Sequence, residues 1–135
     1  FNVYGPRQSS RAIIPTIISQ CFSANQKINL GNLEPTRDLT FVKDTCSGFF
    51  DIFNSEKLFG EVTNIGMNSE ISIGDLTKKI MTLMNVDLSI NIEENRTRPQ
   101  DSEVNRLFCN NQKLIKNSSW NSLTTGLSRF AVLAQ

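Results

Sequence analysis

The chain has 135 residues, of which 39% are hydrophobic and 20% charged, and its 14 basic and 13 acidic residues leave a net charge of +1. This composition is typical of one soluble globular domain and excludes both a basic nucleic-acid-binding field and an acidic solvating tail. Histidine is absent, which excludes Ser-His and Cys-His nucleophile pairs and histidine-ligated metal sites within the chain.

Cysteine usage and hydropathy predict the compartment. Cys21, Cys46 and Cys109 are far apart and form no C-x-x-C pair, which argues against a disulfide framework and against a zinc site. No apolar run approaches the length of a membrane span, and no signal peptide is recognisable. We therefore expect a cytoplasmic protein without a metal or a membrane partner.

The first third of the chain predicts two short strands around one helix. Residues 1–4 have strand-forming side chains, and the Gly5-Pro6 pair stops them. In SSRAIIPTIISQCF, residues 9–22, the apolar side chains recur at helical spacing. KINLG, residues 27–31, predicts a second strand that ends at its glycine.

The middle of the chain predicts a strand and then an amphipathic helix. TRDLTFV, residues 36–42, alternates Leu39 and Phe41 with polar neighbours, as a half-buried strand does. Asp44 is a suitable N-cap for the helix that follows. We expect that helix to bury one apolar stripe, and all four phenylalanines of this region to lie in the core: Phe41, Phe49, Phe50 and Phe53, with Cys46 beside them.

The second half of the chain continues the alternation of predicted strands and helices. EVTNIG, residues 61–66, predicts a strand, and VDLSINI, residues 86–92, predicts another. Between them, residues 72–85 predict a helix in which Ser72 and Asp75 form a capping box.

The carboxyl-terminal part predicts two short helices, around residues 112–116 and 123–133, with Trp120 as a packing residue. Strands that alternate with amphipathic helices indicate an α/β fold: a small mixed sheet with flanking helices. No internal repeat or domain boundary is visible, so residues 1–135 are expected to form a single domain.

Polar residues near strand ends are the candidates for binding. They are Asn2, Arg11, Arg37, Asn64 and Arg98. In α/β sheets, ligands bind beyond the carboxyl ends of strands, and the planar arginine fork suits phosphate. The alternative stays open at this point, because a single arginine is more often a surface residue and a strand-end asparagine is often only hydrogen-bonded locally.

Seven segments carry a resemblance to one enzyme family. FNVYGPRQ resembles the strand and loop that follow the catalytic Tyr-x-x-x-Lys in extended short-chain dehydrogenases/reductases acting on sugar nucleotides. Matching segments follow in the family order: SSRAIIPTII, INLGNLEPTRDLTFVKD, VTNIG, ISIGDLTKKI, RTRPQDSEV and SWNSLTTGL. The resemblance is to NAD-dependent nucleotide-sugar 4,6-dehydratases and 4-epimerases, especially the N-acetylglucosamine 4,6-dehydratase type. It implies the C-terminal, substrate-binding part of a Rossmann-type enzyme.

The resemblance also implies residue roles at the nucleotide. Asn2 would hydrogen-bond the phosphate or sugar of the substrate. Arg11, Ala12 and Ile13 would lie against the nucleotide.

Further residues would bind the base and the diphosphate. Ile28 and Leu30 would flank the base. Arg37 and Arg98 would grip the diphosphate, and Asn64 would lie near the ribose or a phosphate.

Two family features are absent from these 135 residues: the Gly-rich dinucleotide turn and the Tyr-x-x-x-Lys pair. NAD is implied for the full-length family, but no cofactor site and no catalytic residue is expected in this chain. The expected function is therefore binding of a UDP- or dTDP-type nucleotide sugar, without catalysis by the chain alone.

The alternative function is a non-enzymatic α/β module that associates with itself. In either case we expect a homo-oligomer, or a Rossmann half supplied in trans, because apolar surface would otherwise be uncovered. Nucleic acid is not an expected partner.

Overall fold

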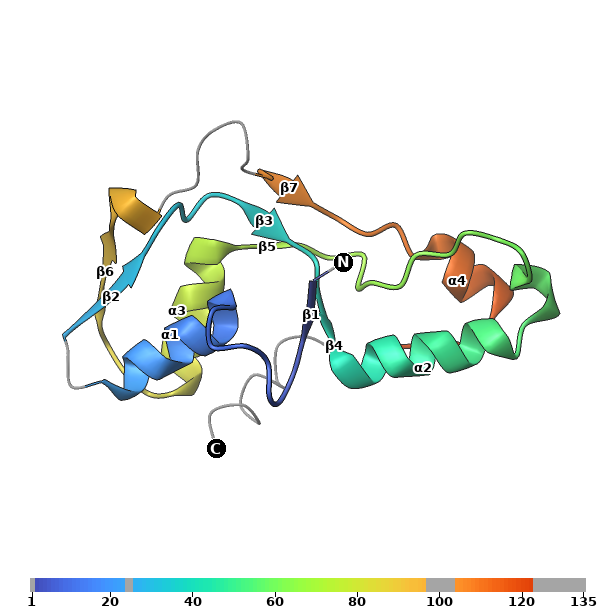
Figure 1. Ribbon diagram of the computed structural model, residues 1–135, viewed down its shortest axis with the longest axis horizontal. Coiled ribbons are helices and arrows are strands. Elements are labelled where there is room, and N and C mark those ends of the chain that lie inside the picture. The colour runs from blue at the N-terminus through green and yellow to red at the C-terminus, as the bar shows by residue number, and fades with distance from the viewer. Residues whose placement is uncertain (1, 24–25, 97–103, 123–135) are drawn as a thin grey trace.

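The computed structural model describes residues 2–23, 26–96 and 104–122. It confirms an α/β fold in which small sheets are flanked by helices (Figure 1). In chain order the elements are β1 (Asn2–Tyr4), α1 (Ile13–Phe22), β2 (Lys27–Leu30), β3 (Thr36–Arg37), β4 (Leu39–Phe41), α2 (Val42–Phe53), the 3-10 turn η1 (Glu56–Leu58), β5 (Ile71–Ser72), α3 (Ile73–Leu83), β6 (Ser89–Ile92), the 3-10 turn η2 (Glu94–Arg96), β7 (Arg106–Leu107) and α4 (Gln112–Asn117).

The described strands form three small sheets. β1 and β4 pair in parallel, with Asn2 opposite Leu39 and Tyr4 opposite Phe41. β2 and β6 also pair in parallel. In the third sheet β3 lies between β5, which is antiparallel to it, and β7, which is parallel to it.

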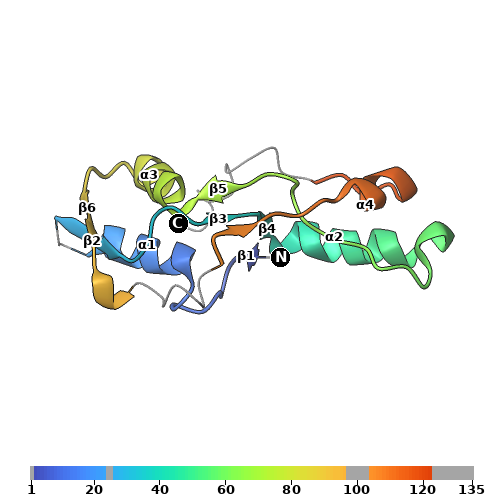
Figure 2. The same cartoon turned by 90° about the horizontal axis from the view of Figure 1, so that it is seen from above.

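The molecule is elongated, and its two ends have separate hydrophobic cores (Figures 1 and 2). At one end, α1 and α3 pack with β2 and β6 around a larger core that includes Ile14, Ile17, Ile28, Leu76 and Ile80. At the other end, a smaller core of Leu58, Leu114 and Trp120 lies between α2, α4 and η1. The β1–β4 pair and the β5–β3–β7 sheet lie between the two ends.

Several expected elements are confirmed. α1, β2, β6 and α4 lie within the predicted segments. α3 is capped as expected: the Ser72 hydroxyl accepts from the Asp75 N–H at 3.0 Å and donates to the Asp75 carboxylate at 2.8 Å. Trp120 is buried, and its indole N–H donates to the Asp44 carbonyl at 3.0 Å. The predicted helix at residues 123–133 lies outside the described residues.

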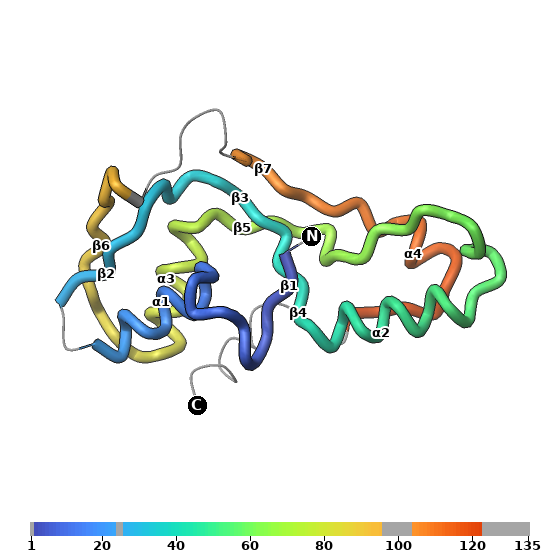
Figure 3. Tube along the Cα trace, in the orientation of Figure 1, coloured from blue at the N-terminus to red at the C-terminus, as the bar shows by residue number. Residues whose placement is uncertain are grey.

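The prediction for segment 61–66 was wrong, because side chains rather than a neighbouring strand occupy its backbone groups. The Asn111 amide donates to the Gly66 carbonyl at 2.7 Å, and the Lys113 ammonium donates to the Val62 carbonyl at 2.9 Å. Figure 3 shows this segment and the chain leading from β7 to α4 running side by side. A Cβ on Gly66 would lie 2.3 Å from the Cβ of Cys109, so only glycine permits this close approach.

Two predictions about α2 were also wrong. The helix begins at Val42 with Phe41 as its N-cap residue, and Asp44 lies buried in the first turn rather than capping it. The other face of α2 packs inward through Gly48, where a Cβ would lie 2.8 Å from the Ile65 side chain. Because that face is inward, three phenylalanines expected in the core are exposed, and only Phe41 of the four is buried: the exposed ones are Phe49, Phe50 and Phe53.

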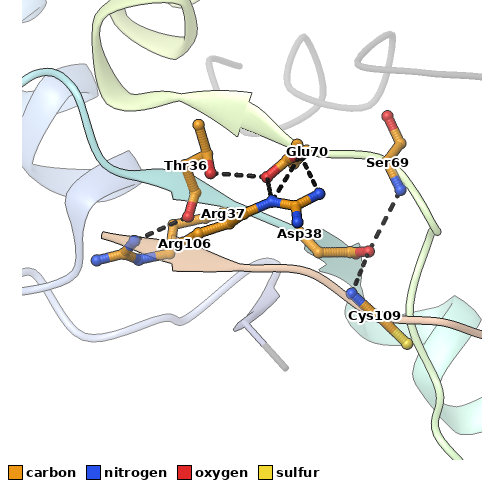
Figure 4. A network of polar contacts seen from close by, with 7 residues as sticks. All are labelled: Thr36, Arg37, Asp38, Ser69, Glu70, Arg106 and Cys109. Carbon is orange, nitrogen blue, oxygen red and sulfur yellow. Dashed lines mark hydrogen bonds and ion pairs between the residues drawn. The ribbon is translucent and has the colours of Figure 1, made fainter. Parts of the chain in front are cut away.

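A buried carboxylate divides the predicted strand 36–42 into β3 and β4. Asp38 is fully buried, and its Oδ1 accepts the Met67 N–H at 2.8 Å. Its Oδ2 accepts the Ser69 and Cys109 N–H groups, each at 3.3 Å (Figure 4). One side chain therefore joins three segments that are distant in the sequence. Charge-assisted hydrogen bonds of this kind are stronger than neutral ones, and a buried donor left without an acceptor is costly.

We expect Asp38→Asn to lower the free energy of unfolding by about 2–4 kcal/mol, because the new NH2 group would face N–H donors. Urea denaturation followed by circular dichroism measures this loss. Asp87→Asn is the matched control, since Asp87 is exposed, and it should change stability by less than about 0.5 kcal/mol. Equal stability of the two variants would contradict the role given to Asp38.

The three cysteines are unpaired and differ in exposure. Cys21 and Cys109 are buried, whereas Cys46 is exposed on α2. Burial, together with the nearby Asp38 carboxylate, raises the pKa of the Cys109 thiol to about 11. Burial also raises the pKa of Cys21. A protonated, buried thiol is a poor nucleophile.

We therefore expect one thiol, that of Cys46, to react rapidly with a disulfide reagent at pH 8 in the folded chain. All three should react once the chain is unfolded in denaturant. Mass spectrometry of labelled peptides identifies the site. Rapid native labelling of Cys109 would show that its segment is not packed as described.

Candidate functional site

A cavity of about 560 Å³ opens on the larger-core end of the molecule, beside β1 and β3. Five parts of the chain form it: β1, the start of α1 with the residues before it, β2 with the loop after it, β3, and the start of α3. Its described lining residues are Asn2, Arg11, Ala12, Ile13, Thr16, Asn29, Leu30, Gly31, Asn32, Pro35, Arg37 and Ile73.

The cavity carries positive charge from two arginines. Arg37 is half-buried on β3, and its Nη1 donates to the Thr36 carbonyl at 2.8 Å. Arg11 is exposed and lies just before α1. The described lining holds these two guanidinium groups and no Asp or Glu. An anionic ligand is therefore favoured there.

Two asparagines add donors to the cavity. The Oδ1 of Asn29 accepts from the Asn91 amide at 3.0 Å, and its backbone N–H and carbonyl are both bonded to the Gln20 amide, at 2.8 and 3.1 Å. The Oδ1 of Asn32 accepts the Glu34 N–H at 3.0 Å. With their oxygens used in this way, both side chains retain N–H groups that can donate to ligand oxygens.

The apolar part of the lining comes from α1, β2 and α3. Ala12, Ile13, Leu30, Pro35 and Ile73 contribute it. Cationic and amide donors beside apolar side chains suit a ligand that combines phosphates with a ring.

An ionic network fixes the strand that carries Arg37. Glu70 accepts from the Arg106 guanidinium at 2.7–3.0 Å and from the Thr36 hydroxyl at 2.7 Å (Figure 4). Arg106 lies on β7 and also stacks over the Phe108 ring at 4.9 Å. The network therefore ties β3 to β7 and to the residue preceding β5.

Six of the nine sequence-predicted site residues line this one cavity: Asn2, Arg11, Ala12, Ile13, Leu30 and Arg37. Ile28 lies instead in the larger core, fully buried and opposite Ile90. Asn64 is exposed and is not among the lining residues. Arg98 lies outside the described residues.

Sequence reasoning did not select the other six lining residues: Thr16, Asn29, Gly31, Asn32, Pro35 and Ile73. Asn29 could have been found, because it alternates with the buried Ile28 and Leu30 along one strand and must point to the other face. Ile73 could not, since its place depends on how α3 packs near the loop after β2.

The cavity does not fit the usual dinucleotide site. Such a site needs closely spaced glycines between a strand and the following helix, so that the backbone can approach a pyrophosphate. The connection from β1 to α1 contains one glycine, Gly5, followed by Pro6. We therefore assign no NAD-dependent step to these residues. Within the described segments, no cluster of metal-ligating side chains is found, and no helix is long and apolar enough to cross a membrane.

Comparison with known proteins identifies the family. The family model described as GDP-mannose 4,6 dehydratase matches residues 1–128. The chain belongs to this family. This confirms the family expected from the sequence, that of NAD-dependent nucleotide-sugar dehydratases and epimerases.

Curated relatives of this dehydratase family include a trifunctional UDP-glucose 4,6-dehydratase/epimerase/reductase of Arabidopsis thaliana, 31% identical over 92% of this chain and 18% of that protein. The dTDP-D-glucose 4,6-dehydratase of Dictyostelium discoideum is 37% identical over 61% of this chain and 19% of its own length. The chain thus spans about a fifth of the length of these relatives. Their names refer to glucose nucleotides, rather than to the N-acetylglucosamine type suggested by the sequence.

Solved structures agree on the fold. The dTDP-glucose 4,6-dehydratase from Bacillus anthracis, in complex with NAD, is 26% identical, with a TM-score of 0.86 over 99% of this chain and 41% of that one. The UDP-glucuronic acid 4-epimerase from Bacillus cereus, in complex with UDP-glucuronic acid and NAD, is 24% identical. Its TM-score is 0.79 over 93% of this chain and 39% of that one. The described α/β fold is therefore part of a Rossmann-type epimerase/dehydratase fold.

The ionic network predicts a pH dependence of stability. Hydrogen bonds from Arg106, and then from Thr36, lower the pKa of Glu70 below its usual value of 4.5. A carboxylate with a lowered pKa stabilises the folded state above its unfolded pKa, and this contribution is lost as the pH falls through the folded pKa. The melting temperature of Glu70→Gln should therefore lie below that of the wild type at pH 7, and the difference should shrink towards pH 3. A difference independent of pH would contradict an ionic role.

Proposed function

We propose that this chain is the nucleotide-sugar-binding part of an NAD-dependent 4,6-dehydratase or epimerase, and that it binds its ligand in the cavity beside β3. The observation that carries the proposal is that Arg11 and Arg37 line one cavity together with the amide side chains of Asn29 and Asn32. A nucleotide diphosphate offers oxygens to both guanidinium groups, and a base or sugar ring can lie on the apolar wall.

Three further facts support this proposal. The chain belongs to a nucleotide-sugar dehydratase family. Relatives carry names that include dTDP-glucose and UDP-glucose. The amide donors of Asn29 and Asn32 suit the oxygens of a UDP- or dTDP-type ligand. In this proposal the chain binds and orients the nucleotide sugar and does not catalyse the reaction by itself.

We also propose a cytoplasmic location. The three unpaired thiols support it, because reducing compartments keep cysteines free. The alternative function, a non-enzymatic module that associates with itself, is favoured by the exposed phenylalanines of α2 but leaves the cationic cavity unexplained. We therefore place nucleotide-sugar binding first.

The proposal predicts measurable binding by the isolated chain. Calorimetric titrations with UDP, dTDP, UDP-glucose, dTDP-glucose and GDP-mannose should reveal a ligand. Arg37→Ala should weaken its binding at least about tenfold, because a charge-assisted phosphate contact contributes about 1.5–3 kcal/mol.

Arg7→Ala is the matched control, since Arg7 is exposed and does not line the cavity. It removes the same charge and should change affinity less than about twofold if the contact is specific. Circular dichroism verifies that both variants are folded. The proposal would be contradicted if none of the five ligands binds, or if both variants lose ligand affinity equally.

A further inference from the structure

The turn before α1 carries two serines next to the cavity. Ser9 and Ser10 are both exposed, and Arg11, which lines the cavity, follows them directly. The turn is closed by the Ala12 N–H, which donates to the Ser9 carbonyl at 2.9 Å. The Thr16 hydroxyl donates to the Ser10 carbonyl at 3.0 Å. Because Thr16 also lines the cavity, Ser10 lies at the cavity rim.

The hydroxyl groups of the two serines are not equivalent. The Ser9 hydroxyl oxygen accepts the Arg11 N–H at 3.3 Å, so it forms part of the turn. The Ser10 hydroxyl has no hydrogen-bond partner among the residues that the structure describes. An exposed hydroxyl that stabilises no part of the fold can be modified without disrupting local structure. Of the two, Ser10 is therefore the better acceptor for a transferred group.

The charges around Ser10 favour one class of modifying enzyme. Arg7 lies three residues before Ser10 and Arg11 one residue after it, and both arginines are exposed. The chain between β1 and α1 forms no helix or strand, so it can enter the groove of another protein. Serine/threonine kinases select substrates partly by charge, and those with acidic grooves prefer an arginine shortly before an exposed serine. The segment RQSSR, residues 7–11, has this pattern.

A phosphoryl group on Ser10 would have cationic neighbours. At pH 7 a phosphoserine carries a charge of about −1.5 to −2 and three strong acceptor oxygens. Arg11 is the next residue in the chain, and Arg37 lines the same cavity. In addition, α1 begins at the N-cap residue Ala12 without a capping side chain and without an acidic residue in its first turn. Its N-terminal N–H groups therefore add to the preference for an anion.

We propose that Ser10 is a phosphorylation site for an arginine-directed kinase, and that its phosphoryl group pairs with Arg11 at the rim of the cavity. In the transfer, the Ser10 Oγ forms a bond to the γ-phosphorus of ATP, while the bond from that phosphorus to the β–γ bridging oxygen breaks. ADP leaves, and the hydroxyl proton passes to the catalytic carboxylate of the kinase. The modified chain then holds an anion of its own beside the cavity.

The consequence for ligand binding rests on the proposed function and adds a means of regulation to it. A phosphoryl group paired with Arg11 withdraws one of the two cavity guanidinium groups from the ligand. It also places like charge beside the diphosphate. Ligand affinity should therefore fall at least about tenfold, the effect expected when one charge-assisted phosphate contact is lost.

Phosphorus-31 NMR tests the pairing without any ligand, in chains made with phosphoserine at a single position. The control position is Ser23, which is exposed at the other end of α1, roughly 15 Å away along the helix. The second pKa of phosphoserine at Ser10 should lie at least about 0.5 below that at Ser23, because nearby cations favour the dianion. Arg11→Ala should remove most of this difference. Equal pKa values at the two positions would overturn the proposal.

Calorimetric titration tests the effect on ligand binding. Phosphoserine at Ser10 should weaken the binding of UDP-glucose or dTDP-glucose at least about tenfold, whereas phosphoserine at Ser23 should weaken it less than about twofold. Equal affinities of the chain with and without the Ser10 phosphoryl group would contradict the regulatory role. If the unmodified chain binds no nucleotide ligand, the proposed function fails, and the NMR comparison still decides whether the phosphoryl group pairs with Arg11.

A kinase assay tests the site itself. Incubation of the folded chain with ATP and a calmodulin-dependent protein kinase, an enzyme of the arginine-directed class, should place phosphate on Ser10, as read by mass spectrometry. Ser10→Ala should abolish this labelling, and Ser9→Ala should not. Arg7→Ala should slow the labelling at least about tenfold, because the kinase loses a charge-assisted contact, yet it should leave ligand affinity nearly unchanged. Labelling of Ser9 instead, or labelling that Arg7→Ala does not slow, would overturn the assignment.

Discussion

Asp38 is the constraint on which the centre of the molecule depends. Its carboxylate is fully buried and accepts backbone N–H groups from two segments, residues 67–69 and residue 109. The residue before it in the chain, Arg37, lines the cavity. The hydrogen bonds that join these three central segments therefore also help to fix the position of β3, the strand that carries Arg37.

The cavity owes its chemistry to segments that are distant in the sequence. Arg11, just before α1, and Arg37, on β3, supply the positive charge. The amide donors are Asn29 on β2 and Asn32 in the loop after it. Gln20 of α1 holds both backbone groups of Asn29, so helix and strand keep a fixed relation at the cavity wall. The donors at this wall are therefore preformed, and preformed donors reduce the ordering cost of binding a flexible ligand.

Features that depend on residues close together in the sequence were predicted correctly. The Ser72–Asp75 cap, the stripe of α1 and the buried Trp120 follow from spacing and residue type alone. Segment 61–66 could not be predicted, because its backbone partners are side chains reached only in the folded state. The apolar residues of α2 share one face, as their spacing predicts, but the expectation that this face is buried was wrong, because periodicity alone does not show which face packs inward. Six of the nine predicted site residues line one cavity. Position near strand ends selected Asn2, Arg11 and Arg37, whereas the family resemblance selected the others: Ala12, Ile13 and Leu30.

The two separate cores should make the two ends of the molecule unfold locally at different free energies. Among the described residues, the larger core, which includes Tyr4 and Phe41 of the β1–β4 pair, has nine buried members, whereas the smaller core has three. Local unfolding free energies follow the apolar surface that an element buries, so the smaller end should exchange its amide protons first. The cavity lies on the larger end and can stay formed during such excursions. Local opening of the α2–α4 end should therefore expose it to proteases without disturbing the residues that line the cavity.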